Sequence, residues 1–214
     1  MIIPNEGETM DRYHNLEVPG NPKIRIVLSA YLNKGPRIVN AAFCCVHSLL
    51  AQTYENFEIY IHHDGPLEDR TLAQKFRDLD QRITFLDDLP HLGLWGFPHR
   101  HPTALLEPQA DYCMWTNEDN YYTPDFLKIM LHTAIKQNSG MIFCNMIHSH
   151  YGWRVFNTRI AVGGIDMGAF IARMDLVRGT PWTDFNPCAD GYYAEKIAAK
   201  TNPVKVDNFL FVHN

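Results

Sequence analysis

Residues 24–66 read IRIVLSAYLNKGPRIVNAAFCCVHSLLAQTYENFEIYIHHDGP and decide the fold class. The stretch opens with a run of aliphatic and β-branched residues over 24–28, which predicts a strand. Over 38–50 the apolar residues recur at helical spacing on one stripe, which predicts an amphipathic helix. A second strand is predicted over 57–62, followed by the Asp-Gly-Pro turn signal at 64–66. Strand, helix and strand in this order are typical of a parallel βαβ unit.

The alternation of strands and helices continues beyond this unit. Periodicity and turn signals predict helices over residues 70–79, 104–109, 124–137 and 192–200, strands over 83–86, 111–116, 141–145, 166–171 and 204–212, and irregular loops over 90–102 and 150–164. This order predicts a Rossmann-like, mostly parallel central sheet flanked by helices. We expect a single compact α/β domain whose two subregions meet near residue 117, after an N-terminal arm over residues 1–22.

Composition excludes several classes of protein. The chain has 214 residues, 46% of them hydrophobic and 20% charged, which is typical of a globular domain with a sizeable core. The net charge of −5 provides no basic field for a nucleic-acid polymer. Five cysteines without a CxxC pair indicate reduced thiols and a cytoplasmic protein. The polar start is unlike a signal peptide, and no apolar run reaches the roughly 18 residues of a membrane span. The chain ends directly after a predicted strand, from which we expect further domains in a longer protein.

Polar clusters follow three of the predicted strands. They are Ser29-Ala30-Tyr31, Asp64-Gly65 and Asn117-Glu118-Asp119-Asn120. In an open α/β sheet, ligands bind outside the carboxyl ends of the strands, so we expect these clusters to meet. Adjacent carboxylates with a free approach suit Mg²⁺ or Mn²⁺, which keeps waters or substrate phosphates in its shell.

Each cluster also has a purely structural interpretation. Glu118 and Asp119 suit the turn before the next helix as well as a metal. Asp64 suits either a turn or an acceptor for a base N–H group. Tyr31 suits either the edge of the core or a platform on which a base stacks.

Other enzyme classes lack their motifs. No P-loop, G-x-G-x-x-G or G-x-S-x-G motif occurs. A zinc site is conceivable at the histidine pairs 99 and 101 and 148 and 150, because residues two apart lie on the same face of a strand. No third ligand at a suitable spacing supports such a site. A sugar-1-phosphate nucleotidyltransferase stays open on its α/β layout, although only Lys34 and Gly35 stand where it needs a Gly-rich basic loop.

Two stretches of the sequence resemble the family-2 type of glycosyltransferases with the GT-A fold. The first carries SAYLN at 29–33, SLLAQTYENFE at 48–58 and HDG at 63–65. The second, NEDNYYTPDFL at 117–127, is similar to the metal motif of the family and the helix that follows it. The sequence departs from the family where His63 replaces the first aspartate of a pair and where Glu-Asp-Asn replaces D-x-D.

The resemblance implies an enzyme that depends on Mn²⁺ or Mg²⁺. Such a hexosyltransferase moves a sugar from a nucleotide-diphosphate donor to a glycan or protein-glycan acceptor in glycan biosynthesis. A UDP-sugar is favoured as the donor over a dTDP- or GDP-sugar. Transfer is expected to invert the configuration at the anomeric carbon. Residues 23–120 would then bind the donor, and residues 121–214 would bind the acceptor and carry catalysis. A non-catalytic relic that binds a nucleotide or a sugar is the alternative from another functional class.

The resemblance also implies roles for individual residues. Donor binding would fall to Ser29, Ala30, Tyr31, Asp64, Arg100, Asn117 and Glu118. The metal would be held by Asp119, with His213 completing its shell. Asp190 would be the catalytic base, with Asp166 in reserve. A helix cap for Asp190 and a surface position for His213 stay open as structural interpretations.

Overall fold

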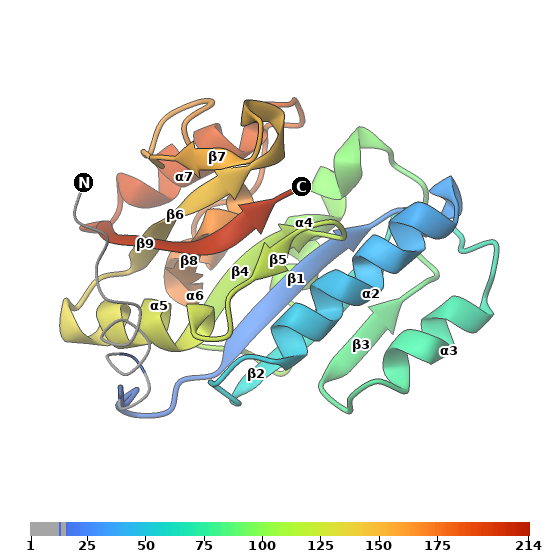
Figure 1. The fold of residues 1–214 in the computed structure, drawn as a ribbon, viewed down its shortest axis with the longest axis horizontal. Coiled ribbons are helices and arrows are strands. Elements are labelled where there is room, and N and C mark those ends of the chain that lie inside the picture. Colours follow the sequence, from blue (N-terminus) through green and yellow to red (C-terminus); the bar gives the residue numbers. More distant parts are fainter. Residues whose placement is uncertain (1–12, 14–15) are drawn as a thin grey trace.

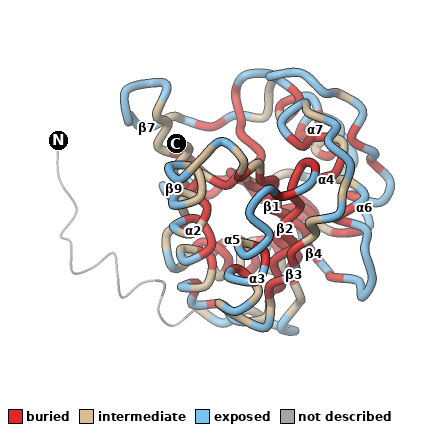
Figure 2. Tube along the Cα trace, turned by 90° about the vertical axis from the view of Figure 1, so that its right-hand side faces the viewer, coloured by how far each residue is buried: buried red, intermediate tan, exposed pale blue. Residues whose placement is uncertain are grey.

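The computed structural model describes Tyr13 and residues 16–214 (Figure 1). Most of the arm predicted over residues 1–22 therefore lies outside the described residues. Within them, nine strands form one sheet with helices packed on it. Buried residues concentrate in the strands at the centre (Figure 2). None of the described helices has the length and apolar character that crossing a membrane requires.

The first half of the sheet is parallel, as predicted. Its strands are β1 (Ile24–Ala30), β2 (Phe57–His63), β3 (Ile83–Leu86) and β4 (Tyr112–Asn117), in the order β3-β2-β1-β4. All seven residues of β1 are buried, which is typical of a parallel strand covered on both faces. Ser29 at the end of β1 pairs in register with His62 of β2 and with Asn117 of β4, so the polar clusters lie at one edge.

The second half continues the same sheet with mixed directions. It contains β5 (Tyr121–Tyr122), β6 (Met141–His148), β7 (Arg154–Phe156), β8 (Phe170–Arg173) and β9 (Val204–His213). Strands β5, β7 and β8 run opposite to the other six described strands, which makes the sheet mostly parallel. Strand β9 runs parallel to β6 and places His213 opposite His148. The end of β9 therefore joins the edge at which β1 and β4 end.

The helices follow the predicted alternation. They are α2 (Pro36–Leu50), α3 (Thr71–Arg77), α4 (Phe97–Ala104), α5 (Phe126–Lys136), α6 (Met174–Arg178) and α7 (Ala189–Ala198). Helices α2 and α3 lie along one face of the β1–β3 region (Figure 1). Helix α4 contacts β1 and β2, and α5 contacts β6 and β9.

The helix predicted over 104–109 is wrong, because α4 ends at Ala104 and lies mostly within the loop predicted over 90–102. Gly96 starts the helix with a left-handed φ of 73°, and a Cβ there would approach Ser29 and His62 to 3.2 Å. Pro98 fits the first turn, where a helix needs no N–H donor. After Ala104 the chain is held instead by Arg25, whose guanidinium binds the carbonyls of Ala104, Leu106 and Pro108.

Further elements also differ from the prediction. The strand predicted over 166–171 starts only at Phe170, because Asp166 caps a 3-10 turn over Met167–Ala169 (η4). Helix α7 starts at Ala189 and not at 192, which places Asp190 in its first turn. The short strand β7 lies inside the loop predicted over 150–164.

The Gln-Thr-Tyr stretch at 52–54 has a structural role. The Gln52 amide donates to the carbonyl of Thr123 (2.7 Å) and accepts the N–H of Leu127 (2.9 Å). The Thr53 N–H donates to the carbonyl of Pro124 (2.8 Å). These bonds tie the end of α2 to the start of α5, and the bond to Leu127 satisfies one of the N–H groups that the first turn of a helix leaves without an intrahelical partner.

One aromatic cluster joins the two halves into a single core. Trp115 of β4 is fully buried. Its ring lies 5.8 Å from Phe170 of β8, 5.9 Å from Trp182 and 5.2 Å from Tyr193 of α7. Since both halves contribute to these contacts, the described residues form one domain, as predicted.

Candidate functional site

A cavity of about 410 Å³ opens at the carboxyl ends of β1, β2 and β4. Six of the seven predicted donor-binding residues line it, and these are Ser29, Ala30, Tyr31, Asp64, Asn117 and Glu118. Each follows or ends a parallel strand, so the shared direction of the strands brings the three clusters together. We call this space the first cavity.

Tyr31 and Glu118 form one wall of the first cavity. The backbone N–H of Tyr31 donates to the Glu118 carboxylate (3.2 Å). Burial raises the pKa of Glu118. The Tyr31 ring lies 5.6 Å from the ring of His63 and 5.4 Å from that of His91. The wall thus combines aromatic surface with a buried carboxylate, groups that suit a base and a sugar hydroxyl.

Asp64 lines the same cavity but already has protein partners. Its carboxylate accepts the N–H of Leu92 (2.8 Å) and faces His91 Nδ1 (3.3 Å) and His99 Nε2 (3.4 Å). A carboxylate offers about four acceptor positions, so one further N–H donor can be accommodated. A nucleotide base that binds Asp64 would share the carboxylate of this residue with the backbone of the loop that precedes α4.

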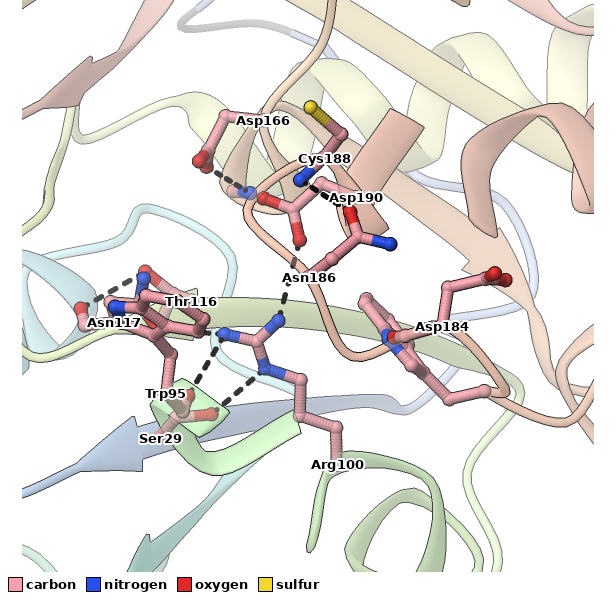
Figure 3. A network of polar contacts seen from close by, with 12 residues as sticks. Ser29, Trp95, Arg100, Thr116, Asn117, Asp166, Asp184, Asn186, Cys188 and Asp190 are labelled. Atoms are coloured by element: carbon pink, nitrogen blue, oxygen red, sulfur yellow. Dashed lines mark hydrogen bonds and ion pairs between the residues drawn. The ribbon is translucent and has the colours of Figure 1, made fainter. Parts of the chain in front are cut away.

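Arg100 lies outside the first cavity, in contrast to the other predicted donor residues. Its Nε donates to Ser29 Oγ (3.1 Å), Nη2 to Asn117 Oδ1 (2.9 Å) and Nη1 to Asp190 Oδ1 (3.3 Å) (Figure 3). The side chain is fully buried. Burial lowers the pKa of Arg100 to about 10, so the guanidinium remains a cation at neutral pH.

A second cavity of about 530 Å³ adjoins the first. Trp95, Asn117 and Asp119 line both cavities and form the wall between them. The second cavity is also lined by three predicted site residues that lie far apart in the second half of the chain, Asp166, Asp190 and His213. Trp95 is 60% exposed and has a left-handed φ of 54°, a backbone conformation that a bulky residue rarely adopts.

The two predicted catalytic aspartates differ in their partners. Asp190 faces Arg100, and burial together with the charge of Asp166 raises its pKa. Burial also raises the pKa of Asp166, but its carboxylate accepts the N–H of Gly168 (2.8 Å) as the cap of η4. A carboxyl group whose pKa is raised toward neutrality is suited to accept a proton. The Asp190 carboxylate also accepts a backbone hydrogen bond from Met167, which partly offsets the rise in its pKa, and of the two aspartates it is the one that pairs with Arg100.

A divalent cation in the second cavity would be bound by Asp119 and His213. Burial raises the pKa of Asp119, and the nearby His213 offsets part of this rise. Burial lowers the pKa of His213, which favours the neutral imidazole that binds metals. The Nδ1 atom of His213 is buried and has no hydrogen-bond partner among the described residues.

The described residues contain no group of three or more histidine, cysteine or acidic side chains arranged to hold a metal. A cation held by Asp119 and His213 would take its remaining ligands from bound phosphate oxygens and water, as Mg²⁺ commonly does.

Two residues at these cavities were considered in the sequence only for other classes of protein. His148 ends β6 and stacks on His213, with ring centroids 4.1 Å apart. Burial, with His213 and His150 nearby, lowers the pKa of His148 to about 4. Lys34 lines the first cavity, with Nζ 5.7 Å from the centroid of Tyr31. His148 follows an apolar strand, which is the same signal that found Ser29.

Comparisons with known proteins identify the fold. No protein-family model matches the chain. "Glycosyltransferase GlyA" of Streptococcus pneumoniae serotype 4 is 19% identical over 150 residues, which cover 63% of this chain and 20% of that protein. The chain thus spans about a fifth of the length of this curated relative.

Solved structures match most of the chain. S. aureus TarS 1–349 superposes with a TM-score of 0.69 at 14% identity, covering 90% of this chain and 60% of that one. The mannosyltransferase PcManGT from Pyrobaculum calidifontis, in complex with GDP-Man and Mn²⁺, gives a TM-score of 0.70 at 12% identity, covering 96% and 62%. The predicted GT-A glycosyltransferase fold is confirmed.

Proposed function

We propose that this GT-A chain is a glycosyltransferase that uses a nucleotide-diphosphate sugar. The arrangement of the two cavities carries the proposal. A pocket with base-binding and sugar-binding groups shares Asp119 with a pocket that contains a candidate base, Asp190. TarS in complex with UDP and with UDP-GlcNAc, and the mannosyltransferase with GDP-Man, support the donor class.

The donor occupies the first cavity in this proposal. Residues 23–120 bind it, with the base between Tyr31 and Asp64 and the sugar toward Glu118. We favour UDP over dTDP and GDP because an aspartate that accepts an N–H group suits uracil. The acceptor, a hydroxyl of a glycan or protein-linked glycan, enters the second cavity. Most of the residues that line this cavity belong to the 121–214 part of the chain.

The proposed reaction is a direct displacement with inversion, with a hexosyl group as the sugar transferred. Asp190 accepts the proton of the acceptor hydroxyl while the oxygen of that hydroxyl forms a bond to the anomeric carbon. The bond between that carbon and the diphosphate oxygen breaks, and the nucleoside diphosphate leaves with the electron pair. Asp119 and His213 are the residues that would hold Mn²⁺ or Mg²⁺, which supplies Lewis-acid stabilisation of the diphosphate.

Calorimetric titration tests the donor class without knowledge of the acceptor. UDP, dTDP, GDP and CMP are titrated into the protein with Mn²⁺ and then with EDTA. We expect one diphosphate to bind, more tightly with Mn²⁺, and Asp119→Ala to lose the Mn²⁺-dependent part. Asp207→Ala is the matched control, because Asp207 is 88% exposed at its side chain and lines neither cavity. Failure of every nucleotide to bind would contradict the proposal.

Release of nucleoside diphosphate from a panel of donor sugars, with mixed sugar acceptors, then tests turnover. Asp190→Asn should keep the affinity for the nucleotide and lose transfer. Normal transfer by this variant would show that Asp190 is not the base. Nucleotide binding without any turnover of the wild type would favour the non-catalytic relic.

A further inference from the structure

We propose that Arg100 is a positioning residue, which holds the carboxylate of Asp190 in place and ties it to the wall of the first cavity, and that it does not bind the donor diphosphate. This inference rests on the proposed function, because that function makes Asp190 the base and the first cavity the donor site. It replaces the donor-binding role that the resemblance implies for Arg100.

The hydrogen-bonding capacity of Arg100 is directed almost entirely at the protein. A guanidinium has five N–H donors. Its Nε donates to Ser29, Nη1 to Asp190, and Nη2 to Asn117 and to the carbonyl of Trp95 (3.5 Å). Four hydrogen bonds therefore engage all three nitrogens, and no pair of N–H groups is left for the bidentate contact by which arginine binds phosphate.

The faces of the guanidinium are also covered. The Cζ atom lies 4.0 Å from the ring centroid of Phe97 and 5.2 Å from that of Trp182. The residue is fully buried, is absent from the lining of the first cavity, and contributes instead to the lining of the second cavity beside Asp190. A ligand in that cavity meets Ser29 and Asn117, and Arg100 lies behind them.

The acceptors of Arg100 come from separate parts of the chain. Ser29 is the penultimate residue of β1, Asn117 ends β4, and Asp190 belongs to the first turn of α7. Arg100 therefore links the strand ends that line the first cavity to the helix that carries the candidate base. A displacement of about 1 Å in a reacting group can lower a rate about 100-fold. Loss of this link should therefore lower transfer while leaving nucleotide binding intact.

Kinetics separate the two roles of Arg100. In Arg100→Lys and Arg100→Gln we expect a nucleoside-diphosphate affinity within about threefold of the wild type and a kcat lower by about 100-fold. Lysine keeps the charge but lacks the planar fork, so it should not restore kcat. A tenfold or greater loss of nucleotide affinity with unchanged kcat would overturn the proposal.

A double variant tests whether Arg100 acts through Asp190. If it does, Arg100→Gln should cause no further loss of transfer in the Asp190→Asn background. A loss in that background as large as in the wild type would overturn the proposal, because it would show an action independent of Asp190. The comparison uses residual transfer measured at saturating donor.

A spectroscopic measurement keeps the test open if the Arg100 variants do not fold. In protein labelled with ¹⁵N-arginine, the buried Nε–H groups of Arg25 and Arg100 should exchange slowly with solvent. Asp190→Asn should shift one protected signal, that of Arg100, and leave the Arg25 signal unchanged as an internal control. Two unchanged signals would overturn the proposal. This measurement needs no substrate, so it stays decisive even if no donor is turned over and the proposed function fails.

Discussion

Replacing Glu58 by alanine should destabilise the fold by about 3–5 kcal/mol, because the change leaves the buried guanidinium of Arg25 without its charged partner. The two residues lie opposite each other on β2 and β1. Arg25 is fully buried, and its Nε and Nη2 donate to Glu58 Oε1 at 2.8 and 2.6 Å. The pair thus crosses the parallel strands that position the first cavity.

The magnitude follows from what remains after the substitution. Arg25 still donates to the carbonyls of Ala104, Leu106 and Pro108, so its side chain is held in the core and cannot turn toward water. Its positive charge then lies buried and uncompensated, which is the costly case for an ion pair. Lys23 also pairs with Glu58, but its side chain is 35% exposed, so we expect this contact to add little.

Urea unfolding followed by tryptophan fluorescence measures the effect, since Trp115 and Trp182 are buried. Thermal unfolding should show a Tm lower by about 6–20 °C for a domain of this size. Asp175→Ala is the matched control, because it breaks an exposed pair with Arg173 and should cost at most about 1 kcal/mol. A loss below about 1 kcal/mol in Glu58→Ala would refute the reasoning.

Two further predictions concern the candidate site. On acidification, transfer should be lost at a pH well above the pKa of an ordinary aspartate, which is about 3.9. The reason is that burial and the charge of Asp166 raise the pKa of Asp190, and the protonated carboxyl group cannot accept a proton. An acid limb near pH 4 in the pH profile of kcat would contradict this prediction. Lys34→Gln should weaken nucleoside-diphosphate binding about tenfold at low salt, which is the lower end of the loss expected for a hydrogen bond to a charged group. Calorimetry measures the affinity, and Lys136→Gln is the control, because Lys136 is exposed and lies outside the first cavity. Equal affinities of the Lys34→Gln variant and the wild type would argue against a role for Lys34.

Local sequence patterns predicted most of the elements and one edge of the site. A strand such as β1, in which every residue is buried, was predictable because a parallel strand covered on both faces requires a nearly continuous run of apolar residues. The clusters at Ser29, Asp64 and Asn117 were predictable because each directly follows such a run. Their convergence then follows from the parallel order of the strands.

The elements that local patterns missed depend on distant partners. The sequence around α4 is rich in glycine and proline, which predicts a loop, yet the helix forms with Gly96 packed against Ser29 and His62. The chain after Ala104 leaves the helix because Arg25, 79 residues earlier, takes up its carbonyl. No local window contains these contacts.

The sequence by itself determined the order of strands and helices and the residue types at the carboxyl edge, because periodicity and burial are written in neighbouring residues. Only the tertiary structure decided that Arg100 faces Asp190 and that His213 stacks on His148. These pairs depend on which strands and helices become neighbours in space. Their altered pKa values arise from loss of water around charged groups, which happens only once the two halves of the domain have packed together.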